Sequence, residues 1–340
     1  MKDFTILMTS CSPRKNEIIN CLYDNDDDAN VSIYATNSDA TELPSRSMVK
    51  DAFVVPLNNA PNYTNTLLAL CEQLSVDILI PRLSSELEIL AHNVNSFEKI
   101  GVQVNVSNLE SLKISNDKEA LYNRYHDIMP FQLKATGSDD IGFMSRCCSR
   151  FCCKLPHSSG AMGFAIVDDE LCDDVTKFHA YGHKHYISTD QLCRIVETQN
   201  LDYILQEFVP GLDYTVSLLA NCGKVTHICG YVGYEMDYSC IMYGEIKAHT
   251  EAFEISRQIV KDLNLDGNVG IDFILKPDGH VVLLEVNPRL NATLPFVAKA
   301  GCNMPYLRCK QLLGYDITDE GQNIVEGLKM RKHYVADYFV

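Results

Sequence analysis

Short apolar runs alternate with helix-patterned segments from residue 5 to residue 106, and this order leaves few folds open. The apolar runs lie at 5–8, 31–36, 52–57, 77–83 and 102–106, and helices are expected near 15–23, 63–75 and 86–98. Such alternation predicts a parallel β-sheet with helices on both of its faces. No G-x-G-x-x-G follows the first run, so a dinucleotide-binding domain has no support.

The pattern changes near residue 115, where the chain is expected to leave the parallel sheet. The segment "SNDKEALYNRYHDI" predicts a helix with Ser115 or Asn116 as its N-cap, because both residue types accept hydrogen bonds from the first turn. Short strands and loops follow, and a further helix is expected near 249–263. Boundaries near residues 112 and 195 divide the chain into regions 1–112, 113–195 and 196–340.

The stretch "IDFILKPDGHVVLLEVNPR" predicts a β-hairpin, because Asp278-Gly279 suits the positive-φ positions of a two-residue turn. Counting outward from that turn places Asp272 directly opposite Glu285. Side chains alternate faces along a strand, so Asn287 lies on the same face as Glu285. The three polar side chains are therefore expected to converge on one patch.

A patch of this kind predicts a metal ion. Two carboxylates side by side in an apolar setting repel each other and lose hydration, unless a cation lies between them. A hard divalent ion, Mg²⁺ or Mn²⁺, prefers oxygen ligands and commonly takes phosphate oxygens as its remaining ligands. The pattern therefore indicates a nucleotide-binding site.

Composition disfavours several classes of protein. The chain has 340 residues, 46% of them apolar, but no apolar run approaches the roughly 20 residues of a transmembrane helix. The N-terminus lacks a signal-peptide core, so a cytoplasmic protein is expected. A net charge of −16 repels polyanions and disfavours nucleic acid as a partner. The acidic segment 24–30 is expected to be a solvated loop, because its adjacent carboxylates lack the geometry of a calcium loop.

Fourteen cysteines are scattered through the chain, and we expect them to be reduced packing residues. The densest group, Cys147, Cys148, Cys152 and Cys153, has zinc binding as its alternative. Adjacent cysteines in a strand point to opposite faces, however, and metal-binding pairs usually have two or more residues between them. Small buried side chains leading to Lys154 are the favoured interpretation.

Lys154 is followed by small residues, among them Ser158, Ser159 and Gly160. Small residues let backbone N–H groups approach phosphate oxygens, and the lysine adds a positive charge. The segment therefore predicts a phosphate-binding loop, with a polar turn between two strands as the alternative. It is not a Walker loop, because the lysine precedes the small residues.

The segment "LQEFVPGLDYTV" places polar and apolar groups at the end of one strand and the start of the next. Gln206 and Glu207 end the first strand, Phe208 and Val209 are apolar, and Asp213 opens the second strand. Such a segment can present backbone groups to an adenine edge, an apolar side chain to its face and a carboxylate to ribose hydroxyls. An ordinary hairpin with surface acids is the alternative.

The order of these parts resembles the ATP-grasp superfamily. A lysine in "NDK", a lysine before a small-residue loop, "QEF" with a following G-x-D, "GIDF" and "LEVNPR" occur in the sequence and spacing typical of it. The resemblance is closest to the carbamoyl-phosphate-synthase-like branch and covers nearly the whole chain. It implies the ATP-grasp fold, in which a Rossmann-like parallel-sheet domain precedes two α+β lobes that hold ATP between them.

The resemblance also implies a role for each candidate residue. It assigns phosphate contacts to Lys118, Lys154 and the loop with Ser158, Ser159 and Gly160, the adenine-facing hinge to Gln206, Glu207, Phe208 and Val209, the ribose contact to Asp213, Mg²⁺ binding to Asp272, Glu285 and Asn287, and the γ-phosphate contact to Arg289. Lys154 and Arg289 are the residues expected to act in catalysis. Asp272 is either a direct metal ligand or a residue behind one.

Two segments depart from the family pattern. Relatives often have proline, arginine and glycine where this chain has Pro156, His157 and Ser158, which puts a phosphate contact from the missing arginine in doubt. Segment 225–256 has Lys247 as its only lysine or arginine, where relatives often place several. The acceptor pocket is therefore expected to suit a small, weakly anionic substrate.

The activity implied by the resemblance is that of an ATP- and Mg²⁺-dependent carboxylate–amine ligase. A small-molecule carboxylate would be phosphorylated to an acyl phosphate and then joined to an amine, such as that of an amino acid, giving an amide, ADP and phosphate. Bicarbonate as the carboxylate is one alternative, and a nucleotide-binding module without catalysis is another. A homodimer is an ordinary assembly for such a chain, and neither the carboxylate nor the amine follows from the sequence.

Overall fold

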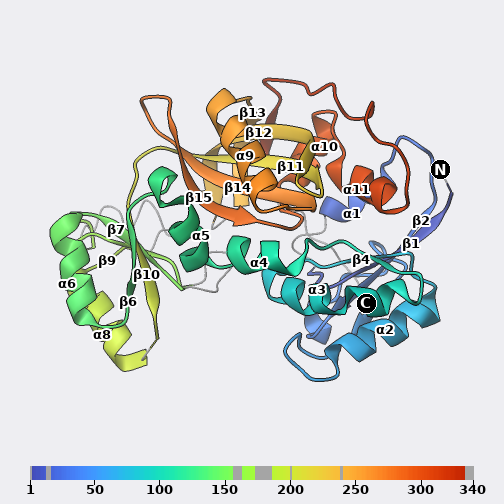
Figure 1. Cartoon of the computed structure of the whole chain (residues 1–340), viewed down its shortest axis with the longest axis horizontal. Coiled ribbons are helices and arrows are strands. Elements are labelled where there is room, and N and C mark those ends of the chain that lie inside the picture. Colours follow the sequence, from blue (N-terminus) through green and yellow to red (C-terminus); the bar gives the residue numbers. More distant parts are fainter. Residues whose placement is uncertain are drawn as a thin grey trace.

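The computed structural model describes residues 2–12, 17–155, 163–172, 186–199, 201–237 and 240–333. Within these ranges the chain forms three β-sheets with helices packed on them. Figure 1 shows the green strands of the second sheet at one end of the molecule and the blue strands of the first sheet toward the other. None of the helices in these ranges is both long and apolar enough to cross a bilayer.

The first sheet is parallel, as the alternating pattern predicts, with strand order β3-β2-β1-β4-β5. Its elements are β1 (Phe4–Met8), α1 (Glu17–Tyr23), β2 (Val31–Asn37), the 3-10 helix η2 (Ala40–Glu42), β3 (Asp51–Val54), α2 (Tyr63–Leu74), β4 (Ile78–Ile80), α3 (Ser84–Glu98) and β5 (Gln103–Val104). Ile6 and Met8 face the side covered by α1, whereas Leu7 packs with α2 and α3 on the other side. Alternation along β1 thus produces two covered faces, and the prediction of helices on both faces is confirmed.

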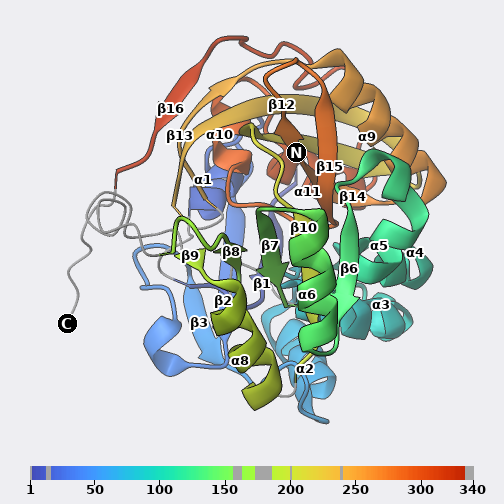
Figure 2. The same cartoon turned by 90° about the vertical axis from the view of Figure 1, so that its left-hand side faces the viewer.

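The second sheet is mixed, with strand order β6-β10-β7-β8-β9. Its elements are β6 (Gln132–Ala135), α6 (Ser138–Cys147), β7 (Phe151–Lys154), β8 (Ala165–Val167), β9 (Tyr186–Ile187), α8 (Thr189–Gln199) and β10 (Tyr203–Glu207). Helices α6 and α8 lie side by side over one face, where Ile141 and Leu192 pack with Leu205 (Figure 2). The boundary predicted near residue 195 falls within α8, and β10 pairs with both β6 and β7, so this sheet extends to Glu207.

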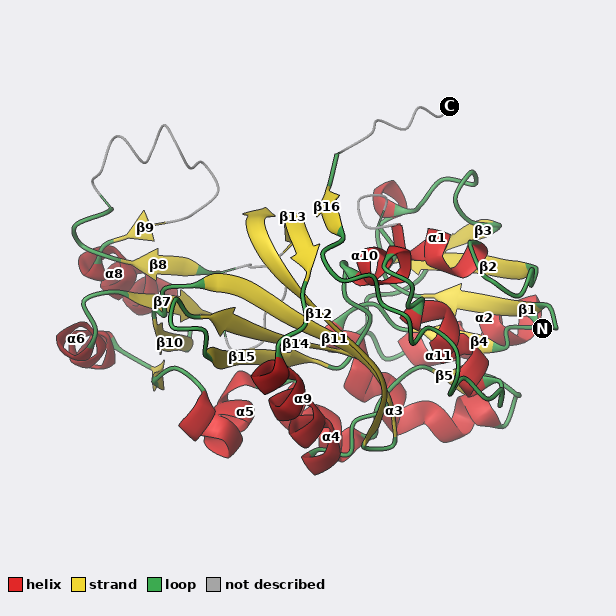
Figure 3. Cartoon of the chain, turned by 90° about the horizontal axis from the view of Figure 1, so that it is seen from above, coloured by secondary structure: helices red, strands yellow, loops and turns green. Residues whose placement is uncertain are grey.

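The third sheet has the strand order β15-β14-β11-β12-β13-β16 and is antiparallel throughout. Its strands are β11 (Leu212–Asn221), β12 (Lys224–Asp237), β13 (Cys240–Ile246), β14 (Gly267–Leu275), β15 (Val281–Asn287) and β16 (Lys329–Arg331). The helices around it are α4 (Leu109–Ser115), α5 (Lys118–Tyr125) with the 3-10 helix η3 (His126–Ile128), α9 (Thr250–Asp262), α10 (Leu294–Lys299) and α11 (Met304–Leu312). Figure 3 shows this sheet between the other two.

Helix α5 precedes the second sheet in the chain but packs on the third, through Leu121. Its N-cap is Asp117, whose carboxylate accepts hydrogen bonds from two backbone N–H groups of the first turn, each at 2.8 Å. The prediction of Ser115 or Asn116 as the cap is wrong, because the chain first ends α4 at these two residues. Lys118 is therefore the first residue of a helix that is fixed to the third sheet.

The first and third sheets share one hydrophobic core. Helices α10 and α11 lie between them, and Ile6 and Met8 of β1 belong to the same cluster as Tyr231 of β12 and Phe296 of α10. The opposite face of the third sheet has its own core, formed with α5 and α9. The face of β1 that α1 covers is thus also covered by helices from the C-terminal part of the chain.

Two buried cations of α11 fasten this arrangement. Arg308, which is 3% exposed, pairs with Asp266 at 2.5 Å. Lys310, which is 6% exposed, pairs with Asp27 at 2.8 Å and with Glu320 at 2.6 Å. We call these five residues the α11 clamp. Asp27 lies in the acidic segment 24–30, which is a largely exposed loop as predicted. Asp27 itself is half-buried, and its bond from Lys310 lowers its pKa.

The hairpin of β14 and β15 has the predicted strand pairing, but its turn differs from the predicted one. A three-residue loop joins the strands, not a two-residue turn, because the Lys276 N–H donates to the His280 carbonyl at 2.9 Å. The additional loop residue shifts the register by one position. A β-bulge at Leu284 shifts it back, so Asp272 still lies opposite Glu285.

All fourteen cysteines lie in the described residues, and none of them forms a disulfide there. Cys152 and Cys153 are buried in β7, while Cys147 is exposed at the end of α6. Burial raises the pKa of Cys153 to about 11, which keeps it in the thiol form. Within the described ranges no three His, Cys, Asp or Glu side chains are grouped to hold a metal. The packing interpretation therefore suits this group better than a zinc site.

Candidate active site

Asp272, Glu285 and Asn287 meet on one face of the third sheet, as the sequence predicts, and we call them the acid patch. The Asn287 Nδ2 donates to Asp272 Oδ2 at 2.9 Å and to Glu285 Oε1 at 3.1 Å. Thr215, on the adjacent strand β11, donates its hydroxyl to Asp272 Oδ1 at 2.6 Å. Sequence reasoning missed Thr215, although its place two residues after Asp213 puts both on the same face of β11.

The two carboxylates of the acid patch differ in their ionisation. Burial raises the pKa of Asp272 to about 7, and the charge of Glu285 adds to this effect. Burial also opposes ionisation of Glu285, but the positive charges of Lys118 and Lys154 outweigh it and hold the pKa of Glu285 below its ordinary value. Glu285 therefore ionises first, and a nearby cation would favour the second negative charge on Asp272.

The donors of the acid patch fit a hard divalent ion. Asp272 and Glu285 lie directly opposite each other and both have an Asn287 Nδ2 bond, and burial together with the charge of Glu285 raises the pKa of Asp272, so a cation at this point would favour its ionised form. Asn287 fits less directly, because it presents its amide nitrogen to both carboxylates while its Oδ1 accepts from Arg289. Its oxygen would reach a metal ion only after the amide group turns over.

Lys118 and Lys154 approach the acid patch from two different sheets. Lys118 begins α5 on the third sheet, and Lys154 ends β7 of the second sheet. Burial lowers the pKa of Lys118, and the nearby charges of Glu285 and Lys154 act on it in opposite directions. The structure thus brings both predicted phosphate-binding lysines near Glu285, although 36 residues separate them in the chain.

Gln206 is the first residue of the segment predicted to face adenine, and its own side chain is bonded inside the protein. Its side chain is only 2% exposed, and its Oε1 accepts a hydrogen bond from the Lys154 Nζ at 2.7 Å. Its Nε2 donates to Gln132, which in turn donates to the Lys118 carbonyl at 3.2 Å. The side chains of Gln206 and Gln132 therefore link Lys154 to the start of α5. No sequence pattern pointed to Gln132, because its role depends on the pairing of β6 with β10.

The rest of the predicted hinge lies at the end of β10, next to the start of β11. Glu207 is exposed, and Phe208 lies under the guanidinium of Arg150, 5.2 Å from its ring centre. Val209 is half-buried in the loop that leads to β11. Asp213 lies on β11 near the acid patch, since its charge contributes to the raised pKa of Asp272.

Arg289 follows the acid patch and is held by three neutral oxygens. Its Nε donates to Ser84 Oγ at 3.0 Å, its Nη1 to the Leu290 carbonyl at 3.2 Å and its Nη2 to Asn287 Oδ1 at 3.3 Å. Among the described residues it forms no ion pair with a carboxylate, and burial lowers the pKa of its guanidinium. The charges of Glu285 and Asp272 act on Arg289 from nearby, but its hydrogen bonds in the described residues go to neutral oxygens, which suits it to an anionic ligand.

A chain of polar side chains extends from the segment after Arg289. Asn291 donates to Ser217 Oγ at 2.9 Å, and Ser217 shares a hydrogen bond of 3.0 Å with the Tyr231 hydroxyl. A Cβ atom at Gly270 would lie 2.8 Å from Asn291 Nδ2, so a larger residue there would move the Asn291 side chain. Sequence reasoning did not identify Ser217 or Asn291, because they meet only when β11 pairs with β14.

Lys247 lies away from this polar chain. It is exposed and directly follows Ile246, which packs in the shared core with Tyr231. Since neighbouring side chains on a strand alternate, Lys247 points to the other face of the third sheet. Ser158, Ser159 and Gly160 of the predicted phosphate loop lie outside the described residues.

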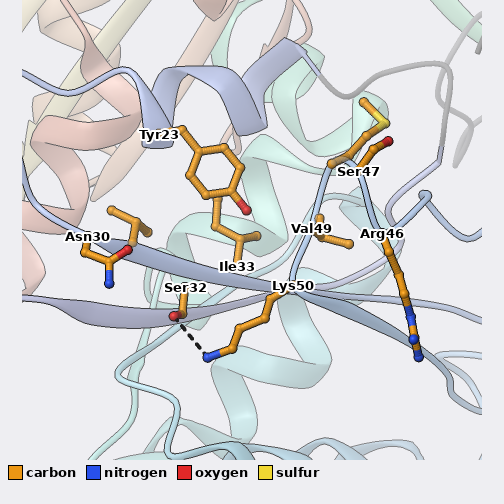
Figure 4. Close-up of a pocket in the computed structure, with 10 residues that line it drawn as sticks. Tyr23, Asn30, Ser32, Ile33, Arg46, Ser47, Val49 and Lys50 are labelled. Carbon is orange, nitrogen blue, oxygen red and sulfur yellow. Dashed lines mark hydrogen bonds between the residues drawn. The ribbon is translucent and has the colours of Figure 1, made fainter.

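A separate pocket of about 420 Å³ lies on the first domain, beside β2 (Figure 4). Arg46 and Lys50 contribute positive charge to its wall. Arg46 pairs with Asp51 at 3.3 Å, and Lys50 donates to Ser32 Oγ at 3.4 Å. Both cations have partners and none of the predicted site residues lines this pocket, so we assign the candidate site to the acid patch and its lysines.

Two family models match the regions that carry these features. The model described as "ATP-grasp in the biosynthetic pathway with Ter operon" matches residues 199–334, and the model described as "PylC-like, N-terminal domain" matches residues 6–105. The chain belongs to the ATP-grasp superfamily. The first match contains the acid patch and Arg289 of this ATP-grasp chain, and the second contains its parallel sheet.

Curated relatives of this ATP-grasp chain include large chains of carbamoyl phosphate synthase. The arginine-specific large chain of Geobacillus stearothermophilus is 33% identical over 96 residues, which are 28% of this chain and 9% of that protein. The arginine-specific large chain of Bacillus subtilis strain 168 is 21% identical over 279 residues, which are 76% of this chain and 25% of that protein. The chain therefore matches a quarter or less of the length of these relatives.

Solved structures share the fold at low sequence identity. N5-carboxyaminoimidazole synthetase from Staphylococcus aureus, in complex with ADP, has a TM-score of 0.67 at 10% identity, covering 93% of this chain and 79% of that one. L-amino acid ligase from Bacillus licheniformis has a TM-score of 0.65 at 11% identity, covering 95% of this chain and 78% of that one. The predicted fold, a parallel-sheet domain followed by two α+β lobes, is confirmed.

Proposed function

We propose that this chain is an ATP- and Mg²⁺-dependent ligase that activates a small-molecule carboxylate and joins it to an amine. The observation that supports this proposal is the meeting of two half-buried carboxylates with three cations that come from different elements. Asp272 and Glu285 lie opposite each other, and within the described residues the hydrogen bonds of Arg289 go to neutral oxygens. A metal–triphosphate ligand would supply a cation to the carboxylates and anionic oxygens to the lysines and the arginine.

Each residue has a role in this proposal. Asp272 and Glu285, with Asn287, would hold Mg²⁺, which supplies neutralisation of the phosphate charge when bound. Lys118 and Lys154 would contact the phosphates, and Arg289 would stabilise the charge that develops on the transferred phosphoryl group. The loop at 158–160 remains a proposed phosphate contact, the segment at 206–209 the adenine-facing hinge, and Asp213 the proposed ribose contact.

The proposed reaction has two bond exchanges. A carboxylate oxygen attacks the γ-phosphorus of ATP, forming an acyl phosphate while the bond to ADP breaks. The amine nitrogen then attacks the acyl carbon, loses a proton and releases phosphate. Positioning and charge neutralisation carry most of such a phosphoryl transfer, so the protein needs no covalent intermediate of its own.

A second candidate is activation of bicarbonate in place of an organic carboxylate. The matches to carbamoyl phosphate synthase large chains favour it. The same acid patch and cations would serve that reaction. ADP release that depends on bicarbonate, and needs no organic carboxylate, would decide for this candidate.

The experiment that tests the proposal is ADP release from Mg-ATP with pooled carboxylates crossed with pooled amino acids, followed by a search for new amide masses. Release that needs both pools and is lost in Glu285→Gln supports the ligase. Glu254→Gln, an exposed acid on α9, is the matched control and should behave as the unaltered chain does. Binding of Mg-ATP without any stimulated release would favour a nucleotide-binding module without catalysis. A cytoplasmic location and a homodimer remain predictions.

A further inference from the structure

The hydrogen bonds of Arg289 come from two parts of the chain. Asn287 and Leu290 are its neighbours in sequence, and both accept through the same local segment. Ser84 lies 205 residues away on the first domain, and its hydroxyl accepts from Arg289 Nε at 3.0 Å. Among these three acceptors, Ser84 is the one whose position does not depend on the segment that carries Arg289.

Ser84 is itself held in place by a buried carboxylate. Glu86, on the same first turn of α3, is 1% exposed and accepts from the backbone N–H of Leu83 at 3.0 Å. Its oxygens also accept from Thr9 at 2.9 Å and from Tyr63 at 2.5 Å. A carboxylate that is this thoroughly hydrogen-bonded fixes the loop before α3 to β1 and α2.

The backbone of Ser84 contacts the segment that leads to Lys118. The Asn116 Nδ2, at the C-cap of α4, donates to the Ser84 carbonyl at 3.0 Å. Ser84 therefore touches the arginine through its side chain and the approach to the lysine through its backbone. The first turn of α3 thus contacts Arg289 directly and the segment that ends two residues before Lys118.

The hydroxyl of Ser84 is not needed to cap its helix. Leu83 is the N-cap residue of α3, and Ser84 is the first residue of the helix proper. Ser85, the next residue, is exposed and its hydroxyl accepts from Asn58 at 2.6 Å on the surface. The two adjacent serines thus have different partners, and Ser85 supplies a matched control.

We propose that Ser84 is a positioning residue, which orients the Arg289 guanidinium toward the γ-phosphate of the nucleotide. This inference rests on the proposed function. The fixed Ser84 hydroxyl takes up the Nε–H, so the guanidinium plane keeps one orientation and its remaining N–H groups point to one place. The first domain would then take part in handling the triphosphate and not only in covering the site.

The test is calorimetric titration of the full chain with Mg-ADP and with the Mg²⁺ complex of AMP-PNP, which has a γ-phosphate and is not hydrolysed. We expect Ser84→Ala to weaken AMP-PNP binding about tenfold relative to ADP, because a hydrogen bond to a charged group contributes about that much. Ser84→Thr retains a hydroxyl and should restore the ratio. Ser85→Ala should match the unaltered chain.

Two results would overturn the role of Ser84, and a third would overturn the proposed function. An unchanged ratio of AMP-PNP to ADP affinity in Ser84→Ala would overturn the inference while leaving the proposed function intact. Equal weakening of both nucleotides would also overturn it, because that result describes a structural role for the serine. If the unaltered chain bound neither nucleotide in the presence of Mg²⁺, the proposed function would fall, and this inference with it.

Discussion

The acid patch and the α11 clamp are two groups of partly or fully buried charges that are paired in different ways. In the clamp, each cation has a carboxylate within 2.8 Å, so its charges are satisfied by the protein alone. In the acid patch, two carboxylates face each other, and the hydrogen bonds of the adjacent Arg289 in the described residues go to neutral oxygens, although the charges of both carboxylates act on it from nearby. Directly paired charges hold helices and sheets together, whereas two carboxylates that face each other are suited to a cationic ligand.

Removing a charge from the acid patch is the most severe test of the difference between the two groups of charges. We expect Glu285→Gln to lower ATP-dependent ADP release by roughly a thousandfold, because the metal and the phosphates lose their ionised ligand. The metal-free protein should also be less stable, because the change removes the stabilisation that Lys118 and Lys154 give to the ionised Glu285. Steady-state kinetics and thermal unfolding measure the two effects. Retained turnover would show that the acid patch is not the site.

Removing a charge from the α11 clamp should lower stability and leave activity unchanged. Arg308→Met leaves Asp266 without its cation, so we expect the free energy of unfolding to fall by about 3 kcal/mol. ADP release per folded molecule should stay unchanged. Urea unfolding gives the first quantity. Lys299→Met is the control, because its pair with Asp24 is exposed and contributes less than about 1 kcal/mol.

The acid patch should also be visible in the pH dependence of stability. Because the pKa of Asp272 is raised to about 7 in the folded protein, folding is favoured when this carboxyl is protonated, and that contribution is lost as pH rises through 7. Metal-free protein should therefore lose roughly 1 kcal/mol between pH 6 and pH 8. Mg²⁺ should reverse the loss. A slope that is unchanged in Asp272→Asn would assign it to another group.

Thr215→Val tests whether the hydrogen bond to Asp272 tunes the metal site. Loss of the 2.6 Å bond removes an interaction that lowers the pKa of Asp272, so the carboxyl should ionise less readily and bind Mg²⁺ about tenfold more weakly. Thermal shift against Mg²⁺ concentration measures the affinity. Thr226→Val, at the far end of the same sheet, should have no effect on it.

Lys247→Ala should give the smallest effect. The side chain is exposed and points away from the polar chain of Ser217 and Asn291, so we expect turnover to change by less than about twofold. The measurement is kcat/KM with any active pair of substrates. A large loss would return Lys247 to the acceptor site and would require the substrate to reach around the edge of β13.

Local sequence patterns predicted much of the fold and the meeting of the acid-patch residues. The alternation of apolar runs and helices specified the parallel sheet, because each parallel strand needs a crossover. The pairing of Asp272 with Glu285 was predicted correctly, although the predicted two-residue turn was wrong. The additional loop residue and the bulge at Leu284 cancel, and neither leaves a signal in hydrophobicity.

Contacts between distant segments could not be predicted from local sequence patterns. The bond of Ser84 to Arg289 joins the first domain to the third sheet, and Asp27 forms an ion pair with Lys310 of α11. Lys118 approaches Glu285 because α5 packs on the third sheet, a choice that its sequence does not encode by itself. Sequence spacing describes neighbours along the chain, and these contacts are set by how whole sheets pack.

The core that α10 and α11 share with β1 has a consequence for dividing the protein. A fragment ending near residue 112 would keep the parallel sheet but would expose Ile6 and Met8 on the side that these helices cover. Such a fragment should self-associate or require a detergent, because a contiguous apolar face of this kind seeks a partner. Grafting the parallel sheet onto another protein would therefore mean carrying residues 294–312 along with it.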